Sequence, residues 1–478
     1  MKYAVIYLKS EWSQPLSEDV TNRGKIKGNS CDTILSLPKG VSPAGLVTMP
    51  PYGATIAGNV LHKLKQEDFI GVFDEYMLHA DIEDMIKDIY ISNKHESLTL
   101  FFSVYVFNND RTIKIIEWIK ICFKDILVVI GGPFAEYFIC NKNVDSVIIG
   151  DAETGIREYL EKKSKLIFAE KANPNEFQID FTVIKKDREY EEGVINSMRG
   201  CKYRTSESKG CVFCSMKEYT LRLRDPELIL KEMAREAEDL STVWFFDGSD
   251  SFVASKKWLK KFSTIRSKLI SDGYEILEKL KIYAYVNPSD VIDKEVTDLL
   301  YHCGIRKVFL GIESGDSTVL VTMSKPKASV EFNRRALKLF EGSNIELRLG
   351  IVIGIGEDEN TLLNTYNFLK DLKQHKELKV VSVVLSPVLV LPGSKLYQNL
   401  ISNKYKMKGQ DLLIIQEIND QLKQGNGITK NFINIISRIY HETNNNISYE
   451  KLLVWIDKMN EMLIKQNIGI WVFDGFNK

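Results

Sequence analysis

Short apolar runs alternate with longer amphipathic runs along the first third of the chain. The apolar runs are rich in Val, Ile, Leu and Phe, as in parallel strands that are buried on both faces. Strands are expected at 3–8, 69–76, 98–107, 126–132 and 145–150, and helices near 54–66, 81–93, 111–123 and 153–163. This order predicts an α/β domain with a doubly wound parallel sheet over residues 1–170.

Two segments interrupt this pattern. Residues 11–50, which include SLPKGVSP and MPP, separate the first strand from its helix. Connections of that length are more often functional or lid-like than neutral. Residues 166–192 are polar and have no clear period, so a linker is expected there.

A second alternating series follows the linker. Strands are expected at 194–198, 242–247, 281–287, 307–314, 345–354 and 379–388, and helices at 226–239, 254–272, 293–303, 329–342 and 359–374. Strand–helix units of this length predict a partial (β/α)6 barrel of the TIM type over residues 190–395. The remainder, 396–478, is predicted to be a mostly helical substrate or capping domain, with Tyr440, Trp455 and Trp471 mainly in its core.

Composition and charge narrow the class of protein. Lys plus Arg equals Asp plus Glu, 64 against 64, so no global charge favours nucleic acid or an anionic membrane. No apolar stretch approaches the roughly 20 residues that span a bilayer. The start, MKYAVIYLKSEW, lacks the features of a signal peptide. We therefore expect a cytoplasmic enzyme with no membrane or nucleic-acid partner.

Three of the seven cysteines crowd together in SMRGCKYRTSESKGCVFCSM, as Cys201, Cys211 and Cys214. Such crowding in a cytoplasmic protein favours metal over disulfides. A [4Fe–4S] cluster has four irons to ligate, so three cysteines would leave one iron open to an external ligand. The spacing alone also allows a structural zinc site.

The other cysteines leave a further alternative open, since Cys303, Cys122 or Cys140 could complete a cluster from a distance. The default expectation is different, because all four remaining cysteines lie in or beside apolar or helical segments. Buried, inert thiols are expected there, at Cys31, Cys122, Cys140 and Cys303. No two histidines have the spacing of a ligand pair, and each is expected to be a surface or packing residue.

Several motifs around the three cysteines carry a family resemblance. CVFC is followed by RLRDPELILKEMAREAE with VWFFDGSDSF, then by AYVNPSDV, GIESGD and MSKP, and then by RLGIVIGIGEDENTLLNT. Over about 190–395 the chain resembles the radical S-adenosylmethionine (SAM) superfamily. The resemblance implies a [4Fe–4S] cluster on the three cysteines, with SAM chelating the open iron. It also implies an external electron donor of the flavodoxin or ferredoxin type and cleavage of SAM to a 5′-deoxyadenosyl radical.

The same resemblance implies roles for residues at the barrel mouth. Phe213 would contact the adenine of SAM and Glu313 its ribose, with Ser314 and Asn287 as weaker candidates at neighbouring strand ends.

Later in the barrel, Gly354 and Gly356 would let the backbone approach the adenine closely. Arg348 would either pair with the SAM carboxylate or have a structural role facing the helices.

Two features depart from the family pattern. The stretch between Cys201 and Cys211 is longer than usual, a spacing shared with the Elongator catalytic subunit and some cobalamin-binding members. FDGSDS replaces the GGE element that often meets the methionyl amine, and Asp247, Ser249 or Asp250 could substitute for it.

The first domain resembles the cobalamin (B12)-binding domain that often precedes a radical SAM barrel. The matching segments are PPYGATIAGNVLHKL, SVYVFNN, GGPFAE and GDAETG, which place Ser103, Gly131, Gly132, Gly150 and Glu153 at carboxyl ends of strands. The Asp-x-His-x-x-Gly motif for a lower histidine ligand is absent, as is common in radical SAM members. The alternative is a relic domain, in which these turns only cap a flavodoxin-like sheet and the domain helps to hold substrate.

These observations leave three functional hypotheses, of which the first leads. It is a cobalamin-dependent methylase acting on an unactivated carbon, or less often phosphorus. The second is a radical SAM enzyme without methylcobalamin that rearranges, cyclises or cleaves a peptide or natural product. The third is a non-catalytic iron–sulfur or SAM-binding regulator. No motif names the substrate, which is expected to be a small molecule or a peptide.

Overall fold

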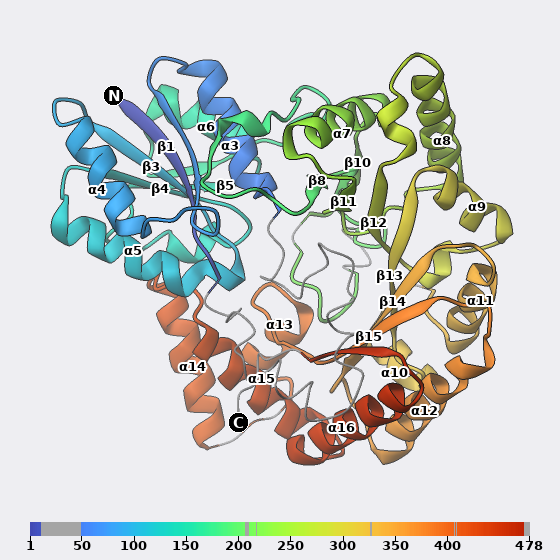
Figure 1. Cartoon of the computed structure of the whole chain (residues 1–478). Coiled ribbons are helices and arrows are strands. Elements are labelled where there is room, and N and C mark those ends of the chain that lie inside the picture. Colours follow the sequence, from blue (N-terminus) through green and yellow to red (C-terminus); the bar gives the residue numbers. More distant parts are fainter. Residues whose placement is uncertain are drawn as a thin grey trace.

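The computed structural model describes residues 1–10, 49–205, 210–216, 218–325, 327–405, 407 and 409–472. Most of the insertion expected at 11–50, including Cys31, therefore lies outside the described residues. Figure 1 shows two α/β units with a group of C-terminal helices beside them.

The N-terminal unit is the predicted doubly wound sheet. Seven strands lie in the order β6-β5-β4-β3-β1-β2-β7, and all neighbouring pairs are parallel. The strands along the middle are β1 (Lys2–Tyr7), β2 (Phe69–Asp74), β3 (Leu98–Ser103), β4 (Leu127–Gly131) and β5 (Ser146–Ile149). The helices are α3 (Tyr52–Leu64), α4 (Ile82–Ser92), α5 (Asn109–Cys122) and α6 (Ala152–Lys162).

The alternation of side chains along β1 explains why helices cover both faces. Tyr3 and Val5 pack in one apolar cluster with residues of α3 and α6, whereas Ala4 and Ile6 pack in another with residues of α4 and α5. Successive side chains of a strand point to opposite faces, so a continuously apolar strand needs cover on both.

The expected linker contributes two edge strands to this sheet, and that part of the prediction is wrong. β6 (Leu166–Phe168) pairs with β5, and β7 (Ile184–Lys185) pairs with β2. Both strands are too short for a period to show in the sequence, and their pairing depends on backbone hydrogen bonds.

The second unit is a parallel sheet in the order β16-β15-β14-β13-β12-β11-β8, curved as in a partial barrel (Figure 1). Its strands are β8 (Gly193–Ile195), β11 (Trp244–Asp247), β12 (Lys281–Val286), β13 (Ile305–Glu313), β14 (Glu346–Ile353), β15 (Val380–Pro387) and β16 (Gly469–Val472). The main helices are α7 (Pro226–Leu240), α8 (Lys256–Ser271), α9 (Lys294–His302), α11 (Val330–Phe340) and α12 (Glu359–Lys370). The six predicted strands are confirmed, and β16 is an addition from a segment expected to be helical.

Between β15 and β16, the described residues form four helices, α13 (Lys395–Ile401), α14 (Gln410–Lys423), α15 (Lys430–Asn444) and α16 (Tyr449–Lys465). α14 and α15 lie beneath the N-terminal unit in Figure 1, and the Asn141 side chain donates a hydrogen bond to the Gly425 carbonyl at 2.9 Å. Tyr440 is fully buried and Trp455 is half-buried, as expected for core aromatics. One apolar cluster runs through α13, α14, α15 and the N-terminal unit, so these parts share a core. The buried residues of α16 pack in the apolar cluster of the barrel.

Within the described residues, we find no helix with the length and apolar character needed to cross a bilayer.

His441 on α15 is a packing residue of this shared region. Its ring is fully buried and stacks on Tyr449 with centroids 5.1 Å apart, and Nε2 lies 3.1 Å from the Val388 carbonyl oxygen. The ring fills the space beside Gly354, where an added Cβ would lie 2.1 Å from its Cε1. Burial lowers the pKa of His441 to about 4.

This shift predicts a loss of stability in mild acid. A histidine in the unfolded chain titrates near pH 6.5. The contribution of buried, neutral His441 to stability is therefore complete above that pH and is lost as the pH falls toward 4. Between pH 7 and pH 5 the free energy of unfolding should fall by about 2 kcal/mol through this residue. His441→Phe should reduce that pH dependence, measured by urea unfolding at both pH values. An unchanged difference between the two pH values would contradict the assignment.

Candidate active site

The three clustered cysteines lie in a segment that is pinned at both ends. β9 (Met198–Arg199) leads into it and β10 (Arg222–Leu223) leaves it, and these strands pair antiparallel with Arg222 opposite Arg199. Within the segment, the Cys214 N–H donates to the Cys211 carbonyl at 3.1 Å. All three cysteines are half-buried.

Burial keeps these thiols protonated in the absence of a ligand. It raises the pKa of Cys211 to about 12 and is also the main cause of the raised pKa values of Cys201 and Cys214. The charge on Lys325 opposes the shift at Cys211. The thiolate is the form that ligates metal, so iron binding would have to drive the deprotonation. No set of three or more His, Cys, Asp or Glu side chains surrounds a single-ion position among the described residues.

The other described cysteines lie elsewhere. Cys303 is buried at the C-terminal end of α9, and its Sγ lies 3.5 Å from the Leu259 carbonyl oxygen. Cys122 and Cys140 are exposed on the N-terminal unit, so the expectation that they are buried is wrong.

Two carboxylates come close to the cysteines at the barrel mouth. Glu313, at the carboxyl end of β13, acts on the pKa of Cys211 and forms an ion pair of 2.8 Å with Lys325. Asp250 acts on the pKa values of Cys201 and Cys214, and burial followed by repulsion from Asp247 raises its own pKa to about 6.

The structure separates the three candidates that replace the missing GGE element. Asp247 is fully buried and accepts hydrogen bonds from Ser197 N–H at 2.9 Å, Ser197 Oγ at 2.8 Å and Ser249 Oγ at 2.9 Å. Ser249 Oγ also accepts from Met198 N–H at 2.9 Å. Asp247 and Ser249 are thus engaged in holding the strand that leads to Cys201, and Asp250 is the exposed member of the three.

Phe213 packs half-buried against the apolar cluster of the N-terminal and C-terminal regions. Ser314 is buried, with its Oγ 3.2 Å from Thr365 Oγ1 on α12. The Asn287 side chain accepts from the Ser289 N–H at 3.1 Å and caps the short helical turn after β12. These hydroxyl and amide groups have structural partners of their own.

Arg348 and the two glycines are not brought to the cysteines by any described contact. Arg348 lies in the first half of β14, fully buried, and its Nε donates to Ser382 Oγ at 3.0 Å. The ring of His441 occupies the Cβ side of Gly354, and the Gly356 N–H donates to Asn445 Oδ1 at 2.8 Å. The turn that carries Gly354 and Gly356 therefore packs against the C-terminal end of α15.

A cavity of about 670 Å³ lies between the two units. The carboxyl ends of β3, β4 and β5 form one wall, and the residues around the cysteines form the other. Every residue predicted for the cobalamin turns lines it, namely Ser103, Gly131, Gly132, Gly150 and Glu153. From the barrel side, Asn196, Arg199, Ser215 and Met216 complete it.

The three glycines of this wall have different physical roles. Gly132 and Gly150 have φ of +103° and +114°, and an added Cβ would lie 2.6 Å and 2.7 Å from backbone oxygens. The backbone conformation and the close backbone contacts therefore require glycine at these two positions. At Gly131, by contrast, an added Cβ would meet nothing within 4 Å, so its missing side chain leaves open space in the cavity.

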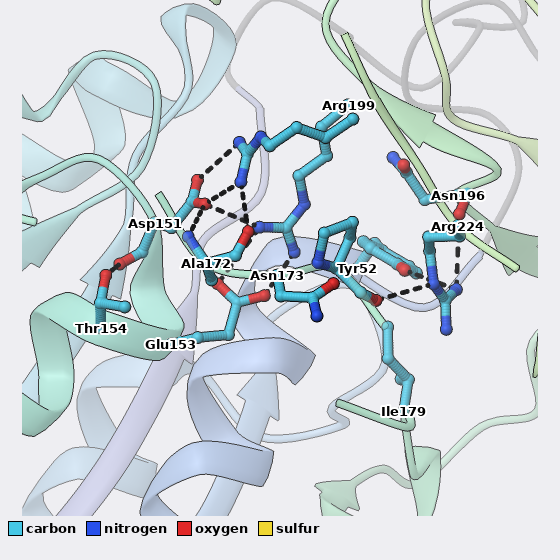
Figure 2. Close-up of polar contacts among 12 residues, drawn as sticks. Tyr52, Asp151, Glu153, Thr154, Ala172, Asn173, Ile179, Asn196, Arg199 and Arg224 are labelled. Carbon is cyan, nitrogen blue, oxygen red and sulfur yellow. Dashed lines mark hydrogen bonds and ion pairs between the residues drawn. The ribbon is translucent and has the colours of Figure 1, made fainter. Parts of the chain in front are cut away.

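Figure 2 shows the ion pairs that join the two walls. Arg199 donates through both terminal nitrogens to the carboxylate of Glu153, which is 2% exposed, and lies 3.3 Å from Asp151. Arg222, opposite Arg199, also pairs with Asp151.

A second contact lies beside this network. Arg224 donates to the Tyr52 hydroxyl of α3 at 3.1 Å and pairs with buried Glu232 at 2.8 Å. Arg199, Arg222 and Arg224 were not predicted from the sequence, although Arg199 precedes the cysteine segment and Arg222 and Arg224 follow it as RLR.

Comparison with known proteins identifies the barrel unit. Residues 195–369 match the Radical SAM superfamily. A Methanocaldococcus jannaschii protein, provisionally named as a methylthiotransferase, is 25% identical over 342 residues, which cover 67% of this chain and 72% of the relative.

Two solved structures share the arrangement of both units. One is the radical SAM methyltransferase TsrM from Kitasatospora setae with cobalamin and a [4Fe–4S] cluster bound, with a TM-score of 0.59, 13% identity and coverage of 84% of this chain and 75% of TsrM. The other is the cobalamin-dependent SAM radical enzyme OxsB with aqua-cobalamin bound, with a TM-score of 0.57 and 14% identity. That match covers all of this chain and 63% of OxsB. At these identities the likeness establishes a common fold.

The ion pair at the cavity wall yields a stability prediction. Arg199→Met should destabilise the protein by about 3 kcal/mol, because it leaves the Glu153 carboxylate buried without its partner. Glu153→Gln combined with Arg199→Met should be less destabilised than Arg199→Met alone, measured by thermal unfolding.

Lys162→Met provides the control, on α6, the helix that also carries Glu153. Lys162 pairs with Glu158 on the exposed face of α6, at 2.9 Å, so its loss should leave the midpoint unchanged. Equal midpoints for Arg199→Met and the wild type would contradict the role given to the buried pair.

Proposed function

The chain contains a radical SAM domain, and we propose that it is a cobalamin-dependent radical SAM methylase acting on an unactivated carbon. The observation that carries this proposal is the cavity between the two units. Its walls are the carboxyl ends of a doubly wound sheet and the cysteine segment of a radical SAM barrel, so a ligand held there lies next to both.

The cysteine segment fits a [4Fe–4S] cluster with one open iron. Cys201, Cys211 and Cys214 are close enough to act on each other's pKa values, and Cys303 is bonded elsewhere. Three thiolates would ligate three irons, and the amine and carboxylate of SAM would occupy the fourth. When bound, the cluster supplies the electron that cleaves SAM, and cobalamin carries the methyl group.

Residues of this chain would orient SAM. We assign Asp250 to the methionyl amine, because Asp247 and Ser249 are engaged with Ser197 and Met198. A carboxylate suits that role, since a charged acceptor strengthens a hydrogen bond from an ammonium group. We assign Glu313 to the ribose hydroxyls, with Phe213 at the adenine side.

The residues that line the cavity suit a corrinoid in their chemistry. Its deep part is apolar, with Val5, Ile56, Phe101 and Ile148 between α3 and the sheet, and its rim carries polar groups. The open space at Gly131 lets a flat ligand approach the end of β4. Histidine is absent from the described residues that line the cavity, so the cobalt would have no histidine ligand from this wall.

The proposal extends to partners. The enzyme would take its electron from an external flavodoxin or ferredoxin, act on a small molecule or peptide, and work in the cytoplasm.

Anaerobic reconstitution with iron and sulfide, with and without hydroxocobalamin, tests the proposal. We expect uptake of corrinoid and formation of both S-adenosylhomocysteine and 5′-deoxyadenosine once substrate and reductant are present. 5′-Deoxyadenosine as the sole SAM product, without corrinoid uptake, would instead favour a radical SAM enzyme that rearranges, cyclises or cleaves its substrate.

Two variants should separate the cofactors. Gly131→Phe fills the open end of the cavity and should abolish corrinoid uptake while the iron content stays at the wild-type level. Cys211→Ala should do the reverse, losing the cluster and keeping the corrinoid. The measurements are iron analysis and the visible absorption of bound cobalamin after desalting. Corrinoid uptake by Gly131→Phe equal to that of the wild type would place the ligand outside this cavity.

A further inference from the structure

Lys325 is a buried cation at the barrel mouth that the sequence motifs do not assign. It follows α10 (Ser317–Thr322) in the MSKP segment and is 9% exposed. Its Nζ donates to Glu313 Oε1 at 2.8 Å and to the Gly311 carbonyl oxygen. An ammonium group this deeply buried persists only where such partners compensate for lost water.

The backbone of β13 is shaped around this pair. Its register with β14 shifts between Gly311 and Glu313, and Glu313 has a φ of +62°, in the left-handed region that non-glycine residues rarely adopt. A Cβ added at Gly311 would lie 2.5 Å from Glu313 Oε1 and 2.9 Å from Lys325 Nζ. A glycine, a strand irregularity and a strained residue thus coincide at one ion pair, and strain of this kind clusters at functional sites.

The segment that carries Lys325 also lies against the cysteine segment. The Val212 N–H donates to the Met323 carbonyl at 3.0 Å, which ties the lysine segment to the residue after Cys211. The position of Lys325 relative to the cysteine segment is therefore fixed by the backbone.

We propose that Lys325 is a positioning residue of the cluster and SAM site. It holds the Glu313 carboxylate in place for SAM, and its charge offsets the negative charge that the thiolates bring to the barrel mouth. A nearby cation stabilises the reduced, more negative form of a cluster and so raises its potential. The inference rests on the proposed [4Fe–4S] cluster and SAM, and it concerns only residues of this chain.

The test uses the full-length protein after anaerobic reconstitution. It compares Lys325→Met, Lys325→Arg and Gly311→Ala with the wild type, and Lys327→Met serves as an exposed control from the same segment. Three quantities are measured for each: iron and sulfide content, the midpoint potential of the cluster by EPR-monitored titration, and the Kd of SAM by calorimetry.

Lys325→Met should shift the midpoint to a more negative potential and raise the Kd of SAM about tenfold, as expected for the loss of a charged hydrogen bond. Lys325→Arg should restore both values toward the wild type. Gly311→Ala should weaken SAM binding, because its methyl group displaces the pair. Lys327→Met should match the wild type in all three measurements.

Unchanged potential and SAM affinity in Lys325→Met would overturn the inference, as would equal effects of Lys327→Met. If Lys325→Met assembles no cluster, the test rests on Lys325→Arg and Gly311→Ala. The inference then fails unless Lys325→Arg behaves as the wild type and Gly311→Ala binds SAM more weakly. Failure of the wild type to assemble a [4Fe–4S] cluster would refute the proposed function itself, and the inference with it.

Discussion

The ion pair between Glu153 and Arg199 is the interaction on which the geometry of this site depends. Glu153 lies in the first turn of α6, after the fifth strand of the N-terminal sheet, and Arg199 lies two residues before Cys201. Glu153 is buried and Arg199 is only partly exposed, so the carboxylate cannot lose its partner at low cost. The pair thereby fixes the cysteine segment against the carboxyl edge of the N-terminal sheet. The cavity lies at that contact, and both residues of the pair line it.

The net charge of the chain is zero, yet charged side chains cluster around this pair. Asp151 and Glu153 stand at the N-terminus of α6, where the helix dipole favours negative charge, and they meet Arg199 and Arg222 from the barrel side. Burial opposes ionisation of Asp151, but the hydrogen bond from Arg222 and the charge of Arg199 lower its pKa below the ordinary value. The carboxylates at this rim are therefore committed to holding the domains together. The rest of the wall that the N-terminal sheet contributes consists mainly of glycines, a serine and apolar side chains.

Much of the fold could be predicted from the sequence, because its central strands are continuously apolar. Five strands of the first sheet and six of the second have that signal, and the structure confirms each. β6, β7 and β16 were missed, since two to four residues at a sheet edge pair through the backbone and leave no periodic pattern. The cysteines and the glycine turns were also found from local motifs. Arg199 and Lys325 could not be found that way, because their partners Glu153 and Glu313 come near them only when the chain folds.

The placement of His441 shows why a glycine motif is an incomplete guide to a binding site. Gly354 lies in a turn expected to approach adenine, and its backbone does have a φ that favours glycine. Yet the space where its side chain would stand holds the imidazole of a residue from α15. Gly131 shows the opposite case, since its φ does not require glycine and its missing side chain opens directly into the cavity. Space left by a glycine therefore indicates a ligand only where no other side chain fills it, and of these two positions Gly131 alone meets that condition.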